Sequence, residues 1–119
     1  MPKAIMSSTI VTKVIDNATF NATVLGQDIN LKGFSNFNVT YNIGTATGSP
    51  TIAIKLQYKG INGQWYDDPD YSLTALSAGS TSGIAFKGFM EAYDTVRVVC
   101  TYTGSGSFAG VSVAFRAKS

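Results

Sequence analysis

The sequence lacks histidine and contains a single cysteine, Cys100, and a single glutamate, Glu91. Without histidine, neither a Ser-His-Asp triad nor a Cys-His pair is possible, because both need an imidazole as general base. With one cysteine, no disulfide joins two positions of the chain, which fits assembly in a reducing cytoplasm. Because Cys100 ends the apolar run at 96–100, we expect a buried, unreactive thiol. These absences argue against nucleophilic enzymes and transition-metal sites.

Charged residues are also scarce, at 13% of the sequence. Such a surface suits extended contact with protein or sugar, because little charge is desolvated on docking. The nine basic residues are scattered and leave a net charge of +2, whereas nucleic-acid binding needs a basic stripe, so we predict no DNA or RNA partner. No apolar run approaches the roughly 20 residues that span a bilayer, and no signal peptide is visible. We therefore expect no membrane partner.

Alternation of apolar and polar residues is the strongest positive signal. It runs through 37–43 and 51–58, as in strands with one buried face, and we predict that these two segments pair antiparallel. The Gly-Ile-Asn-Gly sequence at 60–63 predicts a hairpin turn. Roughly eight short strands without a substantial helix predict an all-β fold, an antiparallel β-sandwich that is jelly-roll-like or Ig-like. The length fits a single domain over 9–119.

Glycine-rich and polar segments are predicted to separate these strands. Residues 44–50 have the composition of a loop, and 104–107 of a turn that joins 95–103 and 111–115 into a second hairpin. Residues 1–8 are polar and without periodicity, and we predict a flexible N-terminal arm.

Asp67, Asp68 and Asp70 form the main concentration of carboxylates. A pair of carboxylates can hydrolyse glycosides, and carboxylates with backbone carbonyls can bind calcium. Adjacent acidic residues beside Pro69 are, however, typical of a turn exposed to water, and their spacing is not that of an EF-hand. We therefore predict a solvated turn, with no catalytic residue, no metal and no cofactor.

Trp65, Tyr66 and Tyr71 lie next to these aspartates in the sequence. Aromatic side chains near loops stack on sugar rings or anchor protein interfaces. Neighbouring residues of a strand point to opposite faces, and a large aromatic is more often buried. We therefore predict that Trp65 enters the core and that Tyr66 and Tyr71 are the better surface candidates.

Three segments together resemble small structural proteins of tailed bacteriophages. They are a Gly-Phe sequence leading into a strand (33–39), a Gly-Ser-Pro loop with an alternating strand that ends in Leu-Gln (48–57), and a Gly-x-Trp hairpin (62–67). The Thr-Val-Arg-Val-Val strand at 95–99, followed by a Gly/Ser turn, also fits. The resemblance covers residues 29–116.

This resemblance implies a non-enzymatic virion protein, a capsid decoration or cement protein that binds the lattice of the major capsid protein. It implies self-association, as trimers, and a place on the capsid surface after assembly in the host cytoplasm. The N-terminal arm would suit strand addition to a neighbour. The predicted interface residues are Lys3, Ala4, Ile5, Met6, Tyr66 and Tyr71. The alternative is a domain of a phage tail, baseplate or fibre that binds host-surface carbohydrate through Trp65, Tyr66 and Tyr71.

Overall fold

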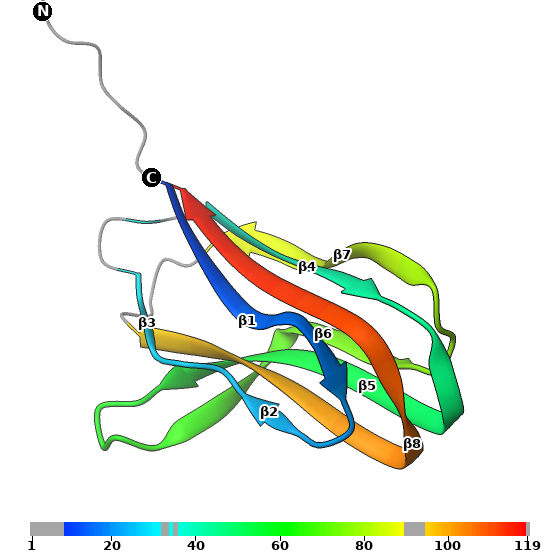
Figure 1. Cartoon of the computed structure of the whole chain (residues 1–119). Coiled ribbons are helices and arrows are strands. Elements are labelled where there is room, and N and C mark those ends of the chain that lie inside the picture. The colour runs from blue at the N-terminus through cyan, green and yellow to red at the C-terminus, as the bar shows by residue number, and fades with distance from the viewer. Residues whose placement is uncertain (1–8, 32–33, 35, 90–94, 119) are drawn as a thin grey trace, which may run out of the picture.

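The structure, a computed structural model, describes residues 9–31, 34, 36–89 and 95–118 (Figure 1). These residues form strands joined by short connections and contain no helix, so the all-β prediction is confirmed; the described residues thus include no helix that could cross a membrane. The strands are β1 (Thr9–Phe20), β2 (Val24–Leu25), β3 (Ile29–Asn30), β4 (Asn36–Ile43), β5 (Ala46–Lys59), β6 (Trp65–Leu76), β7 (Thr81–Phe89) and β8 (Thr95–Lys118).

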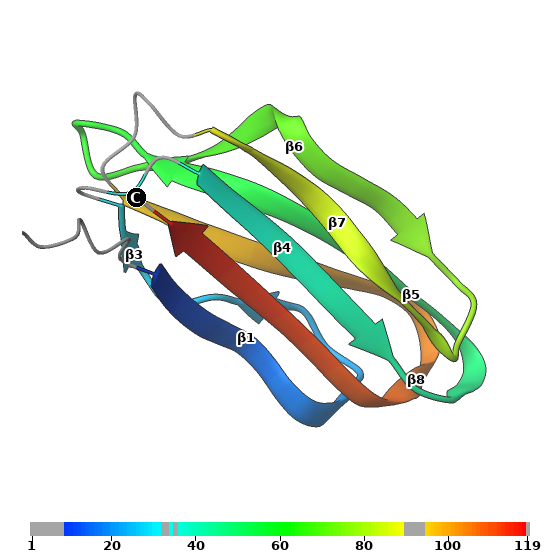
Figure 2. The ribbon, with the colours of Figure 1, turned by 90° about the horizontal axis from the view of Figure 1, so that it is seen from above.

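The long strand β8 is the central strand of the fold. Its C-terminal half pairs with β1 on one side and β4 on the other, and its N-terminal half pairs with β2 and β3 on one side and β5 on the other. β7 then pairs with β4, and β6 with β5. The first sheet is thus β1–β8–β4–β7, seen from above in Figure 2, and the second sheet is β2/β3–β8–β5–β6.

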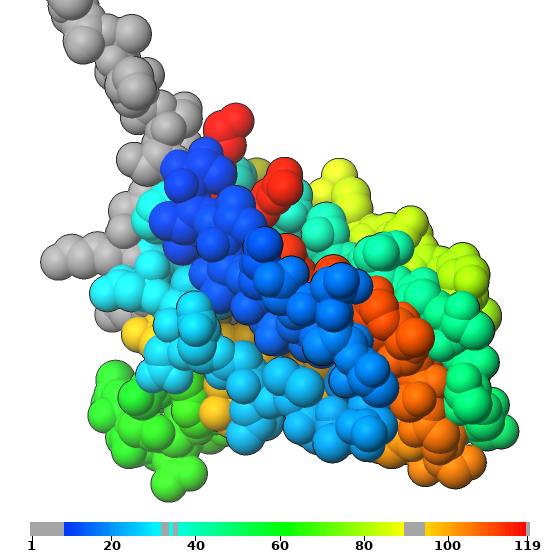
Figure 3. All heavy atoms as spheres, viewed as in Figure 1, coloured from blue at the N-terminus to red at the C-terminus, as the bar shows by residue number. Residues whose placement is uncertain are grey.

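The two sheets lie face to face as two layers (Figures 1 and 3). On one side of the molecule, β1 is the edge strand of the first sheet and the β2–β3 segment is the edge of the second. This strand order is that of the double-sheet jelly roll. The antiparallel sandwich is therefore confirmed, and of the two arrangements left open by the sequence the jelly roll is the one that forms.

β4 and β5 follow β8 in a single register. Asn42 lies opposite Ser112 and, four residues further along each strand, Ala46 lies opposite Phe108. Between these pairs the Gly44 N–H donates to the Ala109 carbonyl at 2.9 Å, and the Ala109 N–H donates to the Thr45 carbonyl at 2.9 Å. The segments 36–59 and 95–118 are therefore one antiparallel ribbon that bends over and contributes to both sheets.

Glycines make this bend possible. Gly48, Gly104 and Gly106 have φ angles of 81°, 93° and 85°, a region that favours glycine. A Cβ atom on Gly106 would also collide with the Thr47 carbonyl oxygen of the opposite strand. The predictions of a loop at 44–50 and a hairpin turn at 104–107 are therefore wrong. Both glycine-rich segments remain paired with each other and bend together.

The predicted pairing of 37–43 with 51–58 is also wrong. β4 lies between β8 and β7, and β5 lies between β8 and β6, so the two segments run end to end along β8. The hairpin at 60–63 is confirmed, because the Gly60 N–H donates to the Gln64 carbonyl at 2.8 Å and β5 pairs with β6.

The core fills the space between the two sheets. Phe115 on β8 stacks on Phe37 of β4 with ring centroids 5.7 Å apart, and Leu56 and Val98 are fully buried. Burying each such side chain contributes roughly 1.5–3 kcal/mol. Cys100 is also fully buried, and desolvation raises the pKa of its thiol to about 12. The prediction of a buried thiol is confirmed, and at neutral pH the thiol is protonated and unreactive.

Candidate functional site

The outer face of the first sheet carries a group of basic side chains, which we call the basic face. Its residues come from neighbouring strands and form cross-strand rows, because alternate residues of each strand point outward. One row contains Val11, Arg116, Asn38 and Lys87, and the next contains Thr9, Lys118, Asn36 and Phe89. In a third row lies Lys13, which forms an exposed ion pair with Asp16 at 3.6 Å.

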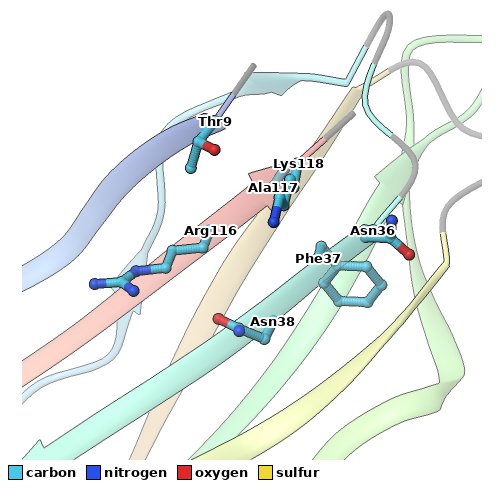
Figure 4. A pocket seen from close by; sticks show the side chains of 7 residues that line it. All are labelled: Thr9, Asn36, Phe37, Asn38, Arg116, Ala117 and Lys118. Carbon is cyan, nitrogen blue, oxygen red and sulfur yellow. The ribbon is translucent and has the colours of Figure 1, made fainter. Parts of the chain in front are cut away.

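Two adjoining grooves lie along these rows. A groove of about 330 Å³ is lined by Thr9, Asn36, Phe37, Asn38, Arg116, Ala117 and Lys118 (Figure 4). A second groove of about 380 Å³ is lined by Asn36, Phe37, Asn38, Lys87, Gly88 and Phe89. The two share the β4 residues 36–38, and within the described residues the Asn38 Oδ1 is buried without a hydrogen-bond partner.

Exposed apolar side chains lie among and beside the polar residues of the basic face. Val11, Ile84 and Phe89 have exposed fractions of 51%, 54% and 65%. Mixed apolar and polar surface of this kind is typical of protein interfaces, where a few large side chains supply much of the contact.

The outer face of the second sheet has a different organisation, which we call the paired ladder. The Asp67 carboxylate accepts hydrogen bonds from Gln57 Nε2 at 2.8 Å and from Lys55 Nζ at 3.2 Å. These hydrogen bonds, first that from Gln57 and then that from Lys55, lower the pKa of Asp67. Arg97 Nε donates to Gln57 Oε1 at 2.8 Å, which extends the ladder onto β8.

Trp65 belongs to the paired ladder and not to the core. Its side chain is partly exposed, with the Arg97 guanidinium 4.4 Å and the Lys59 ammonium 5.8 Å from the ring centroid. Tyr66 instead lies opposite Tyr58, and the two rings stack at 5.6 Å. The prediction of a buried Trp65 is therefore wrong. Trp65 and Tyr66 do point to opposite sides, with Tyr66 on the side of Tyr58, but Tyr66 is itself 42% exposed, so neither ring is buried in the core.

The aspartate-rich segment is also not a solvated turn. Residues 67–70 lie within β6, where the register with β5 shifts between Asp67 and Ser72. Asp68 is only 5% exposed, and its Oδ1 accepts the Asp70 N–H at 2.9 Å. Since Asp67 is exposed and bound in the ladder while Asp68 is buried, the two do not form an open carboxylate pair. No cluster of three potential metal-ligating side chains occurs in the described part of the chain.

Of the predicted interface residues, the structure describes Tyr66 and Tyr71, and these two side chains make different contacts. Tyr66 is 42% exposed, and its hydroxyl accepts a hydrogen bond from Asn62 Nδ2 at 2.8 Å. Tyr71 is half-buried, with its ring 4.9 Å from that of Phe37 and its hydroxyl donating to the Phe89 carbonyl at 3.2 Å. Lys3, Ala4, Ile5 and Met6 lie outside the described residues.

Sequence reasoning missed the basic face because its cations are far apart in the chain. The available signal was local spacing: Asn36 with Asn38, and Arg116 with Lys118, are two residues apart on segments with strand periodicity. Such spacing places both members of each pair on one face of a sheet. It does not reveal that β4 and the end of β8 are neighbours.

Comparison with protein families and with curated proteins finds no match, whereas comparison with solved structures finds several. The structure of infectious bursal disease virus Gx strain matches with a TM-score of 0.63 at 10% identity, over 99% of this chain and 33% of the other. The infectious bursal disease virus VP2 subviral particle matches with a TM-score of 0.60 at 10% identity, over 94% and 32%. This chain therefore spans about a third of the length of these viral chains.

The SPBc2 prophage-derived protein YomS is similar over the whole of both chains, with a TM-score of 0.60 at 12% identity. At these identities the similarities establish the fold alone. They show that this jelly roll occurs both within longer viral chains and as the whole of a prophage-derived chain.

Proposed function

We propose that the protein is a non-enzymatic structural component of a bacteriophage virion. The observation that carries this proposal is the similarity of the whole chain to a prophage-derived protein, together with the same fold in viral particles. The engagement of the aspartates supports a non-enzymatic role, because Asp67 is bound by Lys55 and Gln57, and Asp68 is buried.

Within this proposal the protein decorates the head by binding the lattice of the major capsid protein. A sequence with only 13% charged residues and several exposed apolar side chains suits broad contact with other protein. We further propose that it self-associates as trimers, since several weak contacts in one assembly multiply through avidity. Assembly takes place in the host cytoplasm and the final location is the capsid surface.

The test is to locate the protein in purified particles of the phage that encodes it. Cryo-EM of wild-type particles and of particles made without this gene product should differ in density on the head. Purified protein should also sediment with empty heads. Density in the tail, or absence from particles altogether, would contradict head decoration.

One observation favours a second candidate, a tail or fibre domain that binds host-surface carbohydrate. Trp65 is partly exposed, and polar groups of Gln57 and Asp67 lie on the same outer face. An aromatic ring beside hydrogen-bonding groups is suited to a sugar. A glycan array decides between the candidates: binding that is lost in Trp65→Ala supports the carbohydrate role, and an array without binding, beside sedimentation with heads, supports decoration.

A further inference from the structure

The basic face contains cations without partners. Within the described residues, Lys87, Arg116 and Lys118 are exposed and take part in no ion pair, hydrogen bond or ring contact. On the second sheet each basic side chain is engaged: Lys55 with Asp67, Lys59 with Asp28, and Arg97 with Gln57 and Trp65. The unpaired positive charge of the described residues is therefore concentrated on one face.

These cations are arranged in rows. Arg116 and Lys87 flank Asn38 from the two neighbouring strands, and Lys118 lies beside Asn36 in the next row. Successive rows on one face of a sheet are about 6.8 Å apart, which is also the distance between alternate side chains of an extended chain. An extended segment lying along β4 would thus bring alternate carboxylates to successive rows.

The grooves also need a hydrogen-bond donor. Asn38 Oδ1 is buried in the strip shared by both grooves and has no partner in the described structure. A backbone N–H of an extended polypeptide that enters the grooves is the type of group that this acceptor lacks, whereas an anion without a proton, such as sulfate, cannot supply it. Exposed Phe89 at the rim of the second groove offers an apolar contact to the same segment.

We propose that the two grooves of the basic face bind an extended, acidic segment of a partner protein. The chain's own residues 1–8 have the wrong charge for this role, because they include Lys3 and no acidic residue. The identification of the partner as the capsid lattice rests on the proposed function, but the preference of the grooves for an acidic segment does not.

The first measurement is fluorescence anisotropy with a labelled peptide of four Glu-Thr repeats, and with a Gln-Thr peptide of the same length as control. We expect the acidic peptide to bind at least about tenfold more tightly, because charge-assisted hydrogen bonds are the stronger ones. Added salt should weaken this binding. Equal binding of the two peptides would overturn the proposal. Tighter binding of a single-stranded oligonucleotide or a heparin fragment would also overturn it, since the occupant would then be another polyanion.

Matched double variants place the peptide on the molecule. Lys87→Gln with Arg116→Gln should lower the affinity for the acidic peptide by about tenfold or more. Lys55→Gln with Lys59→Gln removes the same charge from the second sheet and should change the affinity less than about twofold, as expected for a distant exposed charge. An equal loss in both variants would overturn the assignment to the basic face.

Sedimentation with empty heads separates this proposal from the proposed function. If the wild-type protein sediments with heads but does not bind the acidic peptide, the groove proposal fails and the decoration role stands. If it binds the peptide and the Lys87 and Arg116 variant loses both activities, the acidic segment belongs to the head. If that variant no longer binds the peptide but still sediments with heads, the grooves bind an acidic segment as proposed, and the contact with the capsid lattice lies elsewhere on the molecule.

Discussion

The two outer faces of the jelly roll differ in how their charges are used. On the second sheet Asp67, Gln57 and Arg97 are joined by hydrogen bonds, and Trp65 lies against Arg97. On the first sheet Arg116, at the other end of the same strand β8, is exposed and has no partner among the described residues. Both faces cover the same core. The difference therefore lies in the outward-pointing side chains and not in the residues buried beneath them.

Because of this difference, the two faces are expected to contribute differently to stability and to binding. Charges that satisfy one another inside the chain contribute modestly to stability and leave little for a partner. Charges without internal partners contribute little to stability and remain available for binding. We therefore expect substitutions on the paired ladder to change the free energy of unfolding, and substitutions on the basic face to change association.

The largest expected effect tests whether both sheets depend on one core. Phe115→Ala removes a fully buried ring that stacks on Phe37. It should lower the free energy of unfolding by about 3–5 kcal/mol and keep a single transition in chemical denaturation. Phe89→Ala removes a ring that is 65% exposed and is the control, with an expected change within about 0.5 kcal/mol. Separate transitions for the two sheets would contradict a shared core.

The next effect concerns the bend that joins the sheets. Gly106→Ala combines a φ of 85° with a collision against the Thr47 carbonyl, and should lower the free energy of unfolding by more than about 2 kcal/mol. Gly63 has a similar φ of 81° and no atom within 4 Å of an added Cβ. Gly63→Ala should therefore cost only about 1 kcal/mol, the strain of the backbone alone. Equal losses in the two variants, measured by denaturation, would argue against close packing at the bend.

A matched pair on β8 tests the comparison of the faces directly. Arg97→Ala removes the contact with the Trp65 ring and the hydrogen bond to Gln57, and should lower the free energy of unfolding by about 1–2 kcal/mol. Arg116→Ala removes an unpaired side chain from the basic face and should change it by less than about 0.5 kcal/mol. If the two variants lose the same stability in urea denaturation, the faces do not differ as described.

The smallest effect is a dependence on pH. Hydrogen bonds from Gln57 and Lys55 lower the pKa of Asp67 in the folded protein, so the unfolded chain binds the proton more readily. The resulting stabilisation is present above the ordinary value of 3.8 and is lost as the pH falls through the lower folded value. Asp67→Asn should cost below about 1 kcal/mol at pH 7, because the side chain is exposed, and nothing once Asp67 is protonated.

Gln57→Ala removes the largest cause of the lowered pKa of Asp67 and is the companion variant for this prediction. Denaturation curves measured from pH 7 down to pH 2 should show a smaller pH dependence in both variants than in the wild type. An unchanged pH dependence in both would contradict the contribution of the ladder.

The sequence predicted which residues are strands better than how the strands pair. The alternating segments at 37–43 and 51–58 both became strands, because alternation reports directly which side of a strand is buried. In the case of β4 the partner segment lies in β8, with paired residues from 70 (Asn42 and Ser112) to 82 (Asn36 and Lys118) positions apart, and alternation carries no information about such contacts. Glycine was equally ambiguous, since a positive φ permits a tight turn and also a bend within paired strands.

The candidate site was less predictable than the fold. Trp65 and Tyr66 were expected to point to opposite sides, but no local feature says which side is the core, and a shift of one residue exchanges them. The basic face depends on the juxtaposition of β7, β4 and the end of β8, which only the folded sheet creates. Asp68 was expected to be exposed to solvent because Pro69 suggested a turn. In the structure, the residues between Asp67 and Ser72 form an irregularity within β6 and not a turn.

The central position of β8 also determines the order in which the molecule can form. β1, β2, β3, β4 and β5 all use β8 as a partner, and β8 follows every one of them in the sequence. As the chain leaves the ribosome, the β5–β6 hairpin and the β4–β7 pairing can begin, but neither sheet has its middle strand until residues 95–118 emerge. Folding dominated by such distant contacts is slow, on the order of milliseconds to seconds. During that interval the nascent chain presents unpaired strand edges. Aggregation between neighbouring nascent chains therefore competes with folding until β8 has been synthesised.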